Sequence, residues 1–266
     1  MDMDMDFETI KYAVTDNIAR ITLNRPKAAN SMNKQMAHDL MMAAIDCDEN
    51  SDVRAVLLTG AGKMFCAGGD LKSFHAKGDA LPSEIKEMTI YLHGANSRFA
   101  RMDAPLIVAV NGTAAGAGMS LAVSGDLVYA ARSAKFTMAY TAAGLSPDGS
   151  STYFMPRLIG LRRTQELMLT NRVLSADEAL DWGLLNGVHD DDAVLGAAQA
   201  VAETLATGAT RSFGSVKKLL NDSFTNTLET QMELEARGIA AAAQTRDGAA
   251  GIEAFVNKKK ADFTGE

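Results

Sequence analysis

The chain has 266 residues, of which 47% are hydrophobic and 22% are charged, a balance that favours a globular protein with a large buried core. Its formal net charge of -7 argues against a general nucleic-acid-binding protein, because a phosphate backbone is bound by a basic surface. No segment approaches the roughly eighteen consecutive apolar residues of a membrane-spanning helix, so we expect no membrane partner.

The two cysteines, Cys47 and Cys66, are too few for a disulfide framework and favour a reducing compartment. Residues 1–10 are acidic, whereas a secretory signal peptide begins with basic residues. We therefore expect a cytoplasmic protein.

The first predicted elements are a hairpin and a helix. Residues 12–24 alternate between apolar and polar side chains around a central polar pair, which predicts two strands joined by a tight turn. Ser31 or Asn33 can then cap a helix whose apolar residues recur at helical spacing over 36–45. This helix is expected to end near residues 48–52.

Three short apolar runs follow, at 53–60, 105–112 and 126–131. Each predicts a strand that is buried on both faces, and the sequence between the runs is typical of helices. The alternation of strand and helix therefore favours an α/β fold.

From about residue 162 the pattern is mostly helical. Ser175 and Glu178 fit a capping box, and Gly183 fits a helix stop. Further helices are expected over 196–206, 215–220, 227–243 and 249–258. We therefore predict a β/α core over 1–200 and a C-terminal helical region over 201–266, which serves as a packed appendage and oligomerisation arm.

Small residues gather in two loops, "GKMFCAGGDLK" at 62–72 and "NGTAAGAGMS" at 111–120. Glycine and alanine leave room for a ligand to approach the backbone. Taken alone, each loop fits a tight turn with close packing equally well, so both interpretations stay open at this point.

Three stretches together resemble the crotonase superfamily, also called the enoyl-CoA hydratase/isomerase family: residues 62–72, 104–130 and 134–160, with 169–185 following in the family's order. The resemblance implies a crotonase-type spiral of ββα units with helices at the C-terminus, assembled as a homotrimer or a dimer of trimers. It also implies an enzyme that binds an acyl-CoA thioester. No cofactor or metal is expected, because coenzyme A is part of the substrate.

The resemblance also implies site residues. The N–H groups of Gly69 and Ala117 would form an oxyanion hole, in which oriented peptide donors stabilise the negative charge of an enolate oxygen. Arg25 is a candidate for holding the coenzyme. The other candidates for substrate binding are Lys27, Ala28, Ala29, Ala67, Asp70, Leu71, Lys72, Gly116 and Tyr140.

The family's two hydratase glutamates are replaced in this chain by Ser120 and Tyr140. Both side chains are poor proton acceptors near neutral pH, which weakens the prediction of a simple hydratase. Asp148 in "GLSPDGSS" resembles the aspartate of bacterial ring-1,2-epoxyphenylacetyl-CoA isomerases and related enoyl-CoA isomerases. We therefore predict Asp148 as the base of a double-bond or ring-epoxide isomerisation, with a turn or helix cap as its structural alternative.

Three other functions stay open. In 4-chlorobenzoyl-CoA dehalogenases an aspartate at this position is a nucleophile, and His93 falls near the place of their water-activating histidine. A hydratase with displaced acid and base groups is the second alternative, and a non-catalytic acyl-CoA-binding or RNA-binding homologue is the third. The acyl group itself can be aliphatic or aryl, since its candidate lining consists of Phe74, Met88, Leu92, Met138 and Tyr140.

Overall fold

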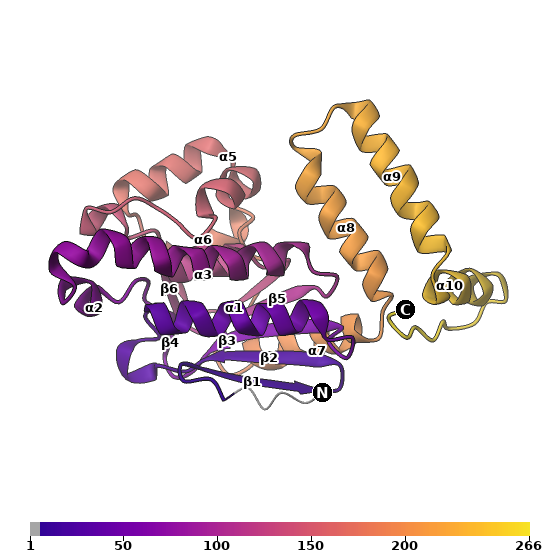
Figure 1. The fold of residues 1–266 in the computed structure, drawn as a ribbon, viewed down its shortest axis with the longest axis horizontal. Coiled ribbons are helices and arrows are strands. Elements are labelled where there is room, and N and C mark those ends of the chain that lie inside the picture. Colours follow the sequence, from indigo (N-terminus) through magenta and orange to yellow (C-terminus); the bar gives the residue numbers. More distant parts are fainter. Residues whose placement is uncertain (1–5) are drawn as a thin grey trace.

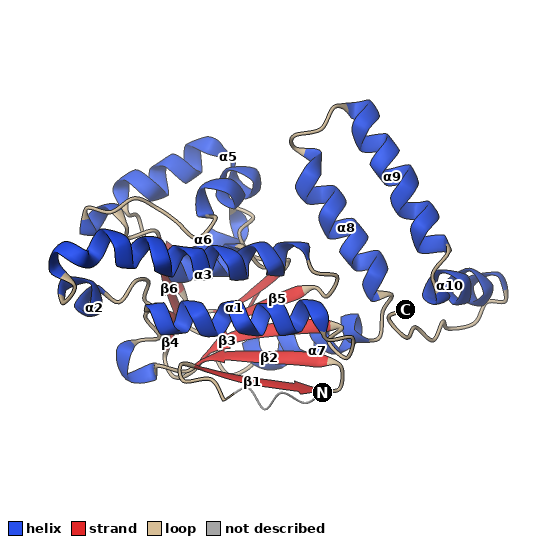
Figure 2. Ribbon diagram, in the orientation of Figure 1, coloured by secondary structure: helices blue, strands red, loops and turns tan. Residues whose placement is uncertain are grey.

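The computed structural model describes residues 6–266, and its strands form two sheets (Figure 2). The large sheet has the order β1-β2-β3-β5-β7-β10, with β1 (Ile10–Thr15), β2 (Ile18–Leu23), β3 (Ala55–Gly60), β5 (Leu106–Val110), β7 (Leu127–Ala131) and β10 (Gly187–His189). The small sheet has the order β4-β6-β8-β9, with β4 (Met64–Cys66), β6 (Thr113–Ala115), β8 (Lys135–Thr137) and β9 (Leu174–Ser175).

The helices follow the strands in a regular alternation (Figure 1). They are α1 (Lys34–Glu49), α2 (Leu71–His75), α3 (Leu81–Arg101), α4 (Ala117–Val123), α5 (Ser151–Thr170), α6 (Ala176–Asp181), α7 (Val194–Ala206), α8 (Thr210–Ser223), α9 (Leu228–Ala243) and α10 (Arg246–Val256). Short 3-10 turns occupy Pro26–Ala28, Gly78–Ala80 and Thr141–Ala143.

The chain winds as a spiral between the two sheets. The pairs β3–β4, β5–β6 and β7–β8 each place one strand in the large sheet and the next in the small sheet, and each pair is followed by a helix. Corresponding strands pair in parallel within each sheet. The repeated unit is therefore the expected strand–strand–helix turn, and it brings the loops after the small-sheet strands together at one edge.

The predicted hairpin is confirmed. β1 and β2 pair antiparallel from Ile10 opposite Leu23 to Thr15 opposite Ile18. Asp16 and Asn17 between them both have positive φ, which two-residue hairpin turns require and which Asp and Asn tolerate. Asn33 is the N-cap of α1, since its side chain accepts a hydrogen bond from the Met36 amide, so of the two predicted caps Asn33 is correct.

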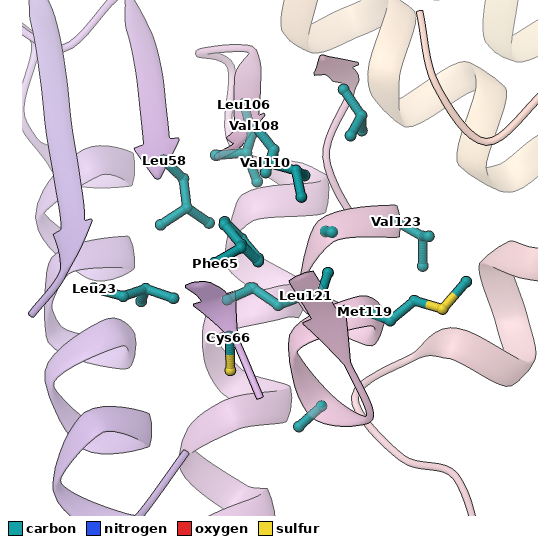
Figure 3. Close-up of a cluster of buried hydrophobic side chains, with 14 of the residues drawn as sticks. Leu23, Leu58, Phe65, Cys66, Leu106, Val108, Val110, Met119, Leu121 and Val123 are labelled. Atoms are coloured by element: carbon teal, nitrogen blue, oxygen red, sulfur yellow. The ribbon is translucent and has the colours of Figure 1, made fainter. Parts of the chain in front are cut away.

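The central strands β3 and β5 of the large sheet are buried on both faces. Val56 and Leu58 of β3 belong to the main core, to which β4, β6, α1, α3 and α4 also contribute (Figure 3). Ala55 and Leu57 alternate to the opposite face, where they pack with Ala198, Ala202 and Ala206 of α7. This two-sided burial explains why the strand sequences are continuous apolar runs rather than alternating ones.

The C-terminal helices α8, α9 and α10 stand to one side of the sheets (Figure 1). Lys217 of α8 anchors them to the core: its ammonium donates to the carbonyl oxygens of Phe99 and Ala104 and forms an ion pair with Asp126 at 2.8 Å. Large apolar side chains of these helices are exposed in the single chain, among them Leu220, Phe224, Leu228, Met232, Ile239 and Phe255. The domain division at residue 200 and the oligomerisation role stay predictions.

The predicted capping box is confirmed, with Ser175 and Glu178 exchanging both hydrogen bonds at the start of α6. Gly183 follows this helix with φ +88, as a stop requires. In the part of the chain that the structure describes, no helix is long and apolar enough to cross a bilayer.

Candidate active site

A cavity of about 310 Å³ opens where the β4–α2 loop, the β6–α4 junction, α3 and residues 139–148 meet. Most of its wall is apolar, with Leu71, Phe74, Ile85 and Met88 on one side. The sequence candidates that line it are Gly69, Ala117, Asp148, Ala67, Leu71, Gly116 and Tyr140. The fold therefore brings the three predicted catalytic positions to one cavity.

The main-chain N–H groups of Gly69 and Ala117 lie at this cavity, and neither has an acceptor among residues 6–266. Gly69 lies in a parallel bridge with Met32, but the two bonds of that bridge use the carbonyl of Gly68 and the amide of Asp70. Ala117 is the first residue of α4, where the amides of a helix have no acceptor within the helix. Both amides are therefore available to a ligand oxygen.

Glycine is required for the two loops to approach each other. A Cβ atom on Gly118 would lie 2.6 Å from the Cβ of Cys66 and closer still to its carbonyl oxygen, and one on Gly68 would lie 2.9 Å from the Ala115 oxygen. Gly116 has φ +50 and ψ -124, a conformation that L side chains rarely adopt. The close packing and the exposed amides are thus one arrangement, and the two interpretations of these glycines do not exclude each other.

Asp148 is linked by hydrogen bonds to Tyr140 and, through it, to Ser120, the two residues that the family resemblance aligns with the hydratase glutamates. The Tyr140 hydroxyl donates a hydrogen bond of 2.6 Å to Oδ1 of Asp148, and the Ser120 hydroxyl lies 2.9 Å from the Tyr140 hydroxyl. Burial, and then the neighbouring Asp148 charge, raise the pKa of the Tyr140 phenol far above its ordinary value. Tyr140 therefore stays protonated and acts as a donor to the Asp148 carboxylate.

The side chain of Asp148 does not cap α5. The N-cap of α5 is Ser150, and Asp148 contributes only its main-chain oxygen there, which accepts from the Ser151 amide and hydroxyl. Gly149 holds the turn, since its amide donates to Nε2 of His93 at 3.2 Å and its oxygen accepts from Asn96. The carboxylate is thereby left to face the cavity.

The charged candidates lie outside the cavity. Asp70 caps α2 through the Ser73 amide and pairs with Arg25 at 2.9 Å. Although burial opposes it, the Ser73 amide and the Arg25 guanidinium hold the pKa of Asp70 below its usual range. Arg25 is thus occupied by Asp70 and by the Ser31 oxygen, while Lys27 and Lys72 are exposed.

Residues 25–32 run beside the loop of residues 67–70 that carries Gly69. The Ala67 amide donates to the Ala29 oxygen, and the Met32 amide donates to the Gly68 oxygen. Ala28 and Ala29 are half-buried in this segment, next to the cavity wall without forming it. The 25–32 segment and the cavity are therefore neighbours, as binding of one extended ligand requires.

The acyl-pocket candidates divide into two groups. Phe74, Met88 and Tyr140 line the cavity, whereas Leu92 and Met138 are fully buried core residues. The sequence prediction missed Ile85 and Thr89 of α3, which line the cavity with Met88. Their spacing of i, i+3 and i+4 on one helix would have revealed them.

No group of three His, Cys, Asp or Glu side chains within residues 6–266 is arranged to hold a metal ion. Cys47 and Cys66 are free and buried, and burial raises the pKa of the Cys66 thiol to about 11.

Comparison with known proteins identifies the family of the chain. The profile of the enoyl-CoA hydratase/isomerase family matches residues 13–266. A 1,2-epoxyphenylacetyl-CoA isomerase of Escherichia coli (strain K12) is 40% identical over 97% of this chain and 99% of the relative. A 4-chlorobenzoyl coenzyme A dehalogenase of Arthrobacter sp. is 32% identical over 85% of this chain and 83% of the relative.

Among solved structures, an enoyl-CoA hydratase from Polaromonas sp. JS666 superposes with a TM-score of 0.91 and 31% identity, covering 96% of this chain and 99% of that one. The chain therefore belongs to the enoyl-CoA hydratase/isomerase family, and its spiral is the crotonase fold. It is an enzyme of the type that acts on acyl-CoA thioesters.

Proposed function

We propose that this protein isomerises an enoyl-CoA thioester, by shifting a double bond or rearranging a ring epoxide, with Asp148 as the base. One observation carries the proposal. Among the described residues, Asp148 is the only carboxylate that lines the cavity holding the free amides of Gly69 and Ala117. Isomerisation needs one group that removes a proton and returns it, whereas hydration also needs a group that activates water.

The proposed reaction begins with the thioester oxygen between the two amides. When Asp148 removes a proton from C2 of a 3-enoyl thioester, the electrons of the C–H bond move toward that oxygen. Each amide then donates to a developing negative charge, and a single such donor typically contributes about 10²- to 10³-fold in kcat. The protonated Asp148 delivers a proton to C4, which leaves the double bond between C2 and C3 and restores the carboxylate.

Tyr140 supports Asp148 in this reaction. Its phenol is protonated and donates to one carboxylate oxygen, which orients the group without competing for the substrate proton. Ser120, hydrogen-bonded to the same phenol, holds the ring hydroxyl in place. Tyr140 and Ser120 therefore orient the single base, Asp148.

The rest of the substrate follows from the surroundings. Leu71, Phe74, Ile85 and Met88 suit an apolar acyl group. We assign the coenzyme to the neighbouring 25–32 segment, with Lys27 and Lys72 as exposed cations for its phosphates and with Ala28, Ala29 and Asp70 forming its support. No further cofactor takes part in the proposed reaction. We also propose the family's trimer or dimer of trimers and a cytoplasmic location.

A second candidate is hydrolysis with Asp148 as a nucleophile toward an aryl-CoA, as in the dehalogenase relative. The observation that favours it is the position of His93, whose Nε2 contacts the Gly149 amide directly after Asp148. That contact occupies Nε2 as an acceptor, which leaves Nδ1 as the nitrogen that can reach other groups. We therefore place isomerisation first.

The two functions, and hydration, are separated by incubation with 2-enoyl-, 3-enoyl- and aryl-CoA thioesters in deuterated water. We expect the wild type to shift the double bond of 3-enoyl-CoA, and Asp148→Asn to be at least about 100-fold slower, since general-base catalysis contributes about 10²- to 10⁴-fold. Asp79→Asn, the same change at an exposed position in the 3-10 turn Gly78–Ala80 before α3, serves as the control.

Three results would contradict the isomerase proposal. The first is a 3-enoyl-CoA that neither exchanges hydrogen nor shifts its double bond. The second is an Asp148→Asn variant as active as Asp79→Asn. The third is net addition of water to 2-enoyl-CoA, or release of a leaving group from aryl-CoA, as the main reaction.

A further inference from the structure

A second cavity, of about 440 Å³, adjoins the candidate active site between α3 and the start of α5. Its lining is more polar than that of the candidate active site and includes His93, Asn96 and Arg101 from α3 and Ser150 from the N-cap of α5. Among residues 6–266, Asp148 is the only one that lines both this cavity and the apolar one. Asp148 therefore lies between an apolar cavity and a more polar one.

The polar cavity suits water. Its volume exceeds many times the roughly 30 Å³ that one water molecule occupies in the liquid. Asn96 is only 3% exposed, and its Nδ2 donates to the Gly149 oxygen at 2.9 Å and to the Ser150 hydroxyl at 3.3 Å. Its Oδ1 accepts no hydrogen bond from any described residue. Buried acceptors of this kind are usually satisfied by ordered water.

The carboxylate is also arranged for exchange with water. Oδ1 of Asp148 accepts from Tyr140, whereas no residue of the described chain donates to Oδ2. The turn that carries Asp148 is fixed, because Gly149 has φ +61 and its two polar backbone groups are bound by His93 and Asn96. Oδ2 thus has no hydrogen-bond donor among the described residues, and it belongs to the residue that both cavities share.

We propose that the cavity bounded by His93, Asn96 and Ser150 is a water site through which Asp148 exchanges its proton with solvent during turnover. The inference rests on the proposed isomerisation. After Asp148 takes the C2 proton, its O–H hydrogen exchanges with a hydrogen of water in this cavity, with no net change in either molecule. Asp148 then delivers a solvent-derived proton to C4, and the C4–H bond forms as the carboxylate returns.

The test blocks the polar cavity and leaves the apolar one unchanged. Ser97 and Ala100 of α3 line the polar cavity and not the apolar one, so Ser97→Leu and Ala100→Leu reduce the volume of the polar cavity without substituting any residue of the apolar one. Ser83→Leu makes the same change on the same helix outside both cavities. Each variant converts 3-enoyl-CoA in deuterated water, and NMR measures deuterium at C4 of the product per turnover. Thermal melting confirms that each variant is folded.

We expect wild type and Ser83→Leu to place deuterium at C4 in most turnovers. In Ser97→Leu and Ala100→Leu that fraction should fall by about threefold or more while kcat changes by less than about twofold, because the protein excludes the exchanging water and not the substrate. An unchanged deuterium fraction in both blocked variants, or a wild-type product without deuterium, would overturn the water site. Failure of the wild type to shift the double bond would refute the proposed function instead.

Discussion

Gly118→Ala tests most directly whether close packing between the β4–α2 loop and the start of α4 positions the amides of Gly69 and Ala117. The added Cβ would lie 2.6 Å from the Cβ of Cys66 and nearer still to the Cys66 carbonyl oxygen, whereas real Cβ contacts are essentially never shorter than 3.0 Å. Both obstructing atoms belong to Cys66 itself, at the end of β4, so no flexible side chain can turn away. The β4–α2 loop and α4 must therefore move apart by several tenths of an ångström.

This displacement acts on the candidate catalytic geometry. Gly69 follows Cys66 by three residues, and Ala117 directly precedes Gly118, so the distance between their amides changes with the loops. A misplacement near 1 Å can cost about 100-fold in rate. We expect kcat/KM for 3-enoyl-CoA to fall about 10- to 100-fold, and overpacking to cost about 1 to 3 kcal/mol of unfolding free energy.

The assay compares steady-state kinetics and thermal melting of Gly118→Ala with those of Gly196→Ala. Gly196 lies in α7, and a Cβ there would meet nothing within 4 Å. Gly196→Ala should keep wild-type kinetics, and its free energy of unfolding should rise by up to about 1 kcal/mol, because alanine favours a helix more than glycine does. If Gly118→Ala matched Gly196→Ala in both rate and stability, the close loop contact would not position the amides.

Three further predictions concern single side chains. Tyr140→Phe removes the hydrogen bond to Asp148, so kcat should fall about 5- to 30-fold with little change in KM, and an unaltered kcat would contradict its orienting role. Because the pKa of Asp70 is lower in the folded than in the unfolded protein, its contribution to the free energy of unfolding is complete above pH 3.8 and is lost as the pH falls below that value. In urea titrations, Asp70→Asn should therefore lose less unfolding free energy than the wild type between about pH 5 and pH 3. Burial raises the pKa of Cys66 to about 11 and of Cys47 to about 12, so mass spectrometry should find neither alkylated by iodoacetamide at about pH 8 until the protein is unfolded.

The central strands β3 and β5 could be predicted because burial on both faces gives continuous apolar runs, and the hairpin strands β1 and β2 could be predicted from alternation. The strands of the small sheet could not. β4, β6 and β8 are three residues each, too short for any periodicity to appear. They are positioned by the spiral itself, through pairing with strands far along the chain.

The first part of α5 could not be predicted from the sequence, for a different reason. The sequence predicts a helix only from about residue 162, whereas the helix begins at Ser151. Pro156 interrupts the helical pattern, and Gly160, with φ +78, breaks the backbone into two helical pieces across a kink. A pattern method based on a continuous amphipathic face therefore detects the second piece alone.

The candidate site residues that belong to sequence motifs could be predicted. Gly69, Ala117, Tyr140 and Asp148 came from the family resemblance, and the structure brings them to one cavity. The hydrogen bond from Tyr140 to Asp148 was not predictable because it depends on the path of an irregular loop, and the second cavity was not predictable because it depends on how that loop packs against α3. Contacts between segments far apart in sequence leave no local pattern.

The most direct measurement of the central claim is a crystal structure of the protein with a bound, saturated acyl-CoA that cannot isomerise. The account predicts a thioester oxygen about 2.7 to 3.1 Å from the nitrogens of both Gly69 and Ala117, with C2 of the acyl group facing the Asp148 carboxylate. A thioester oxygen bound to other donors, or a C2 atom turned away from Asp148, would contradict it.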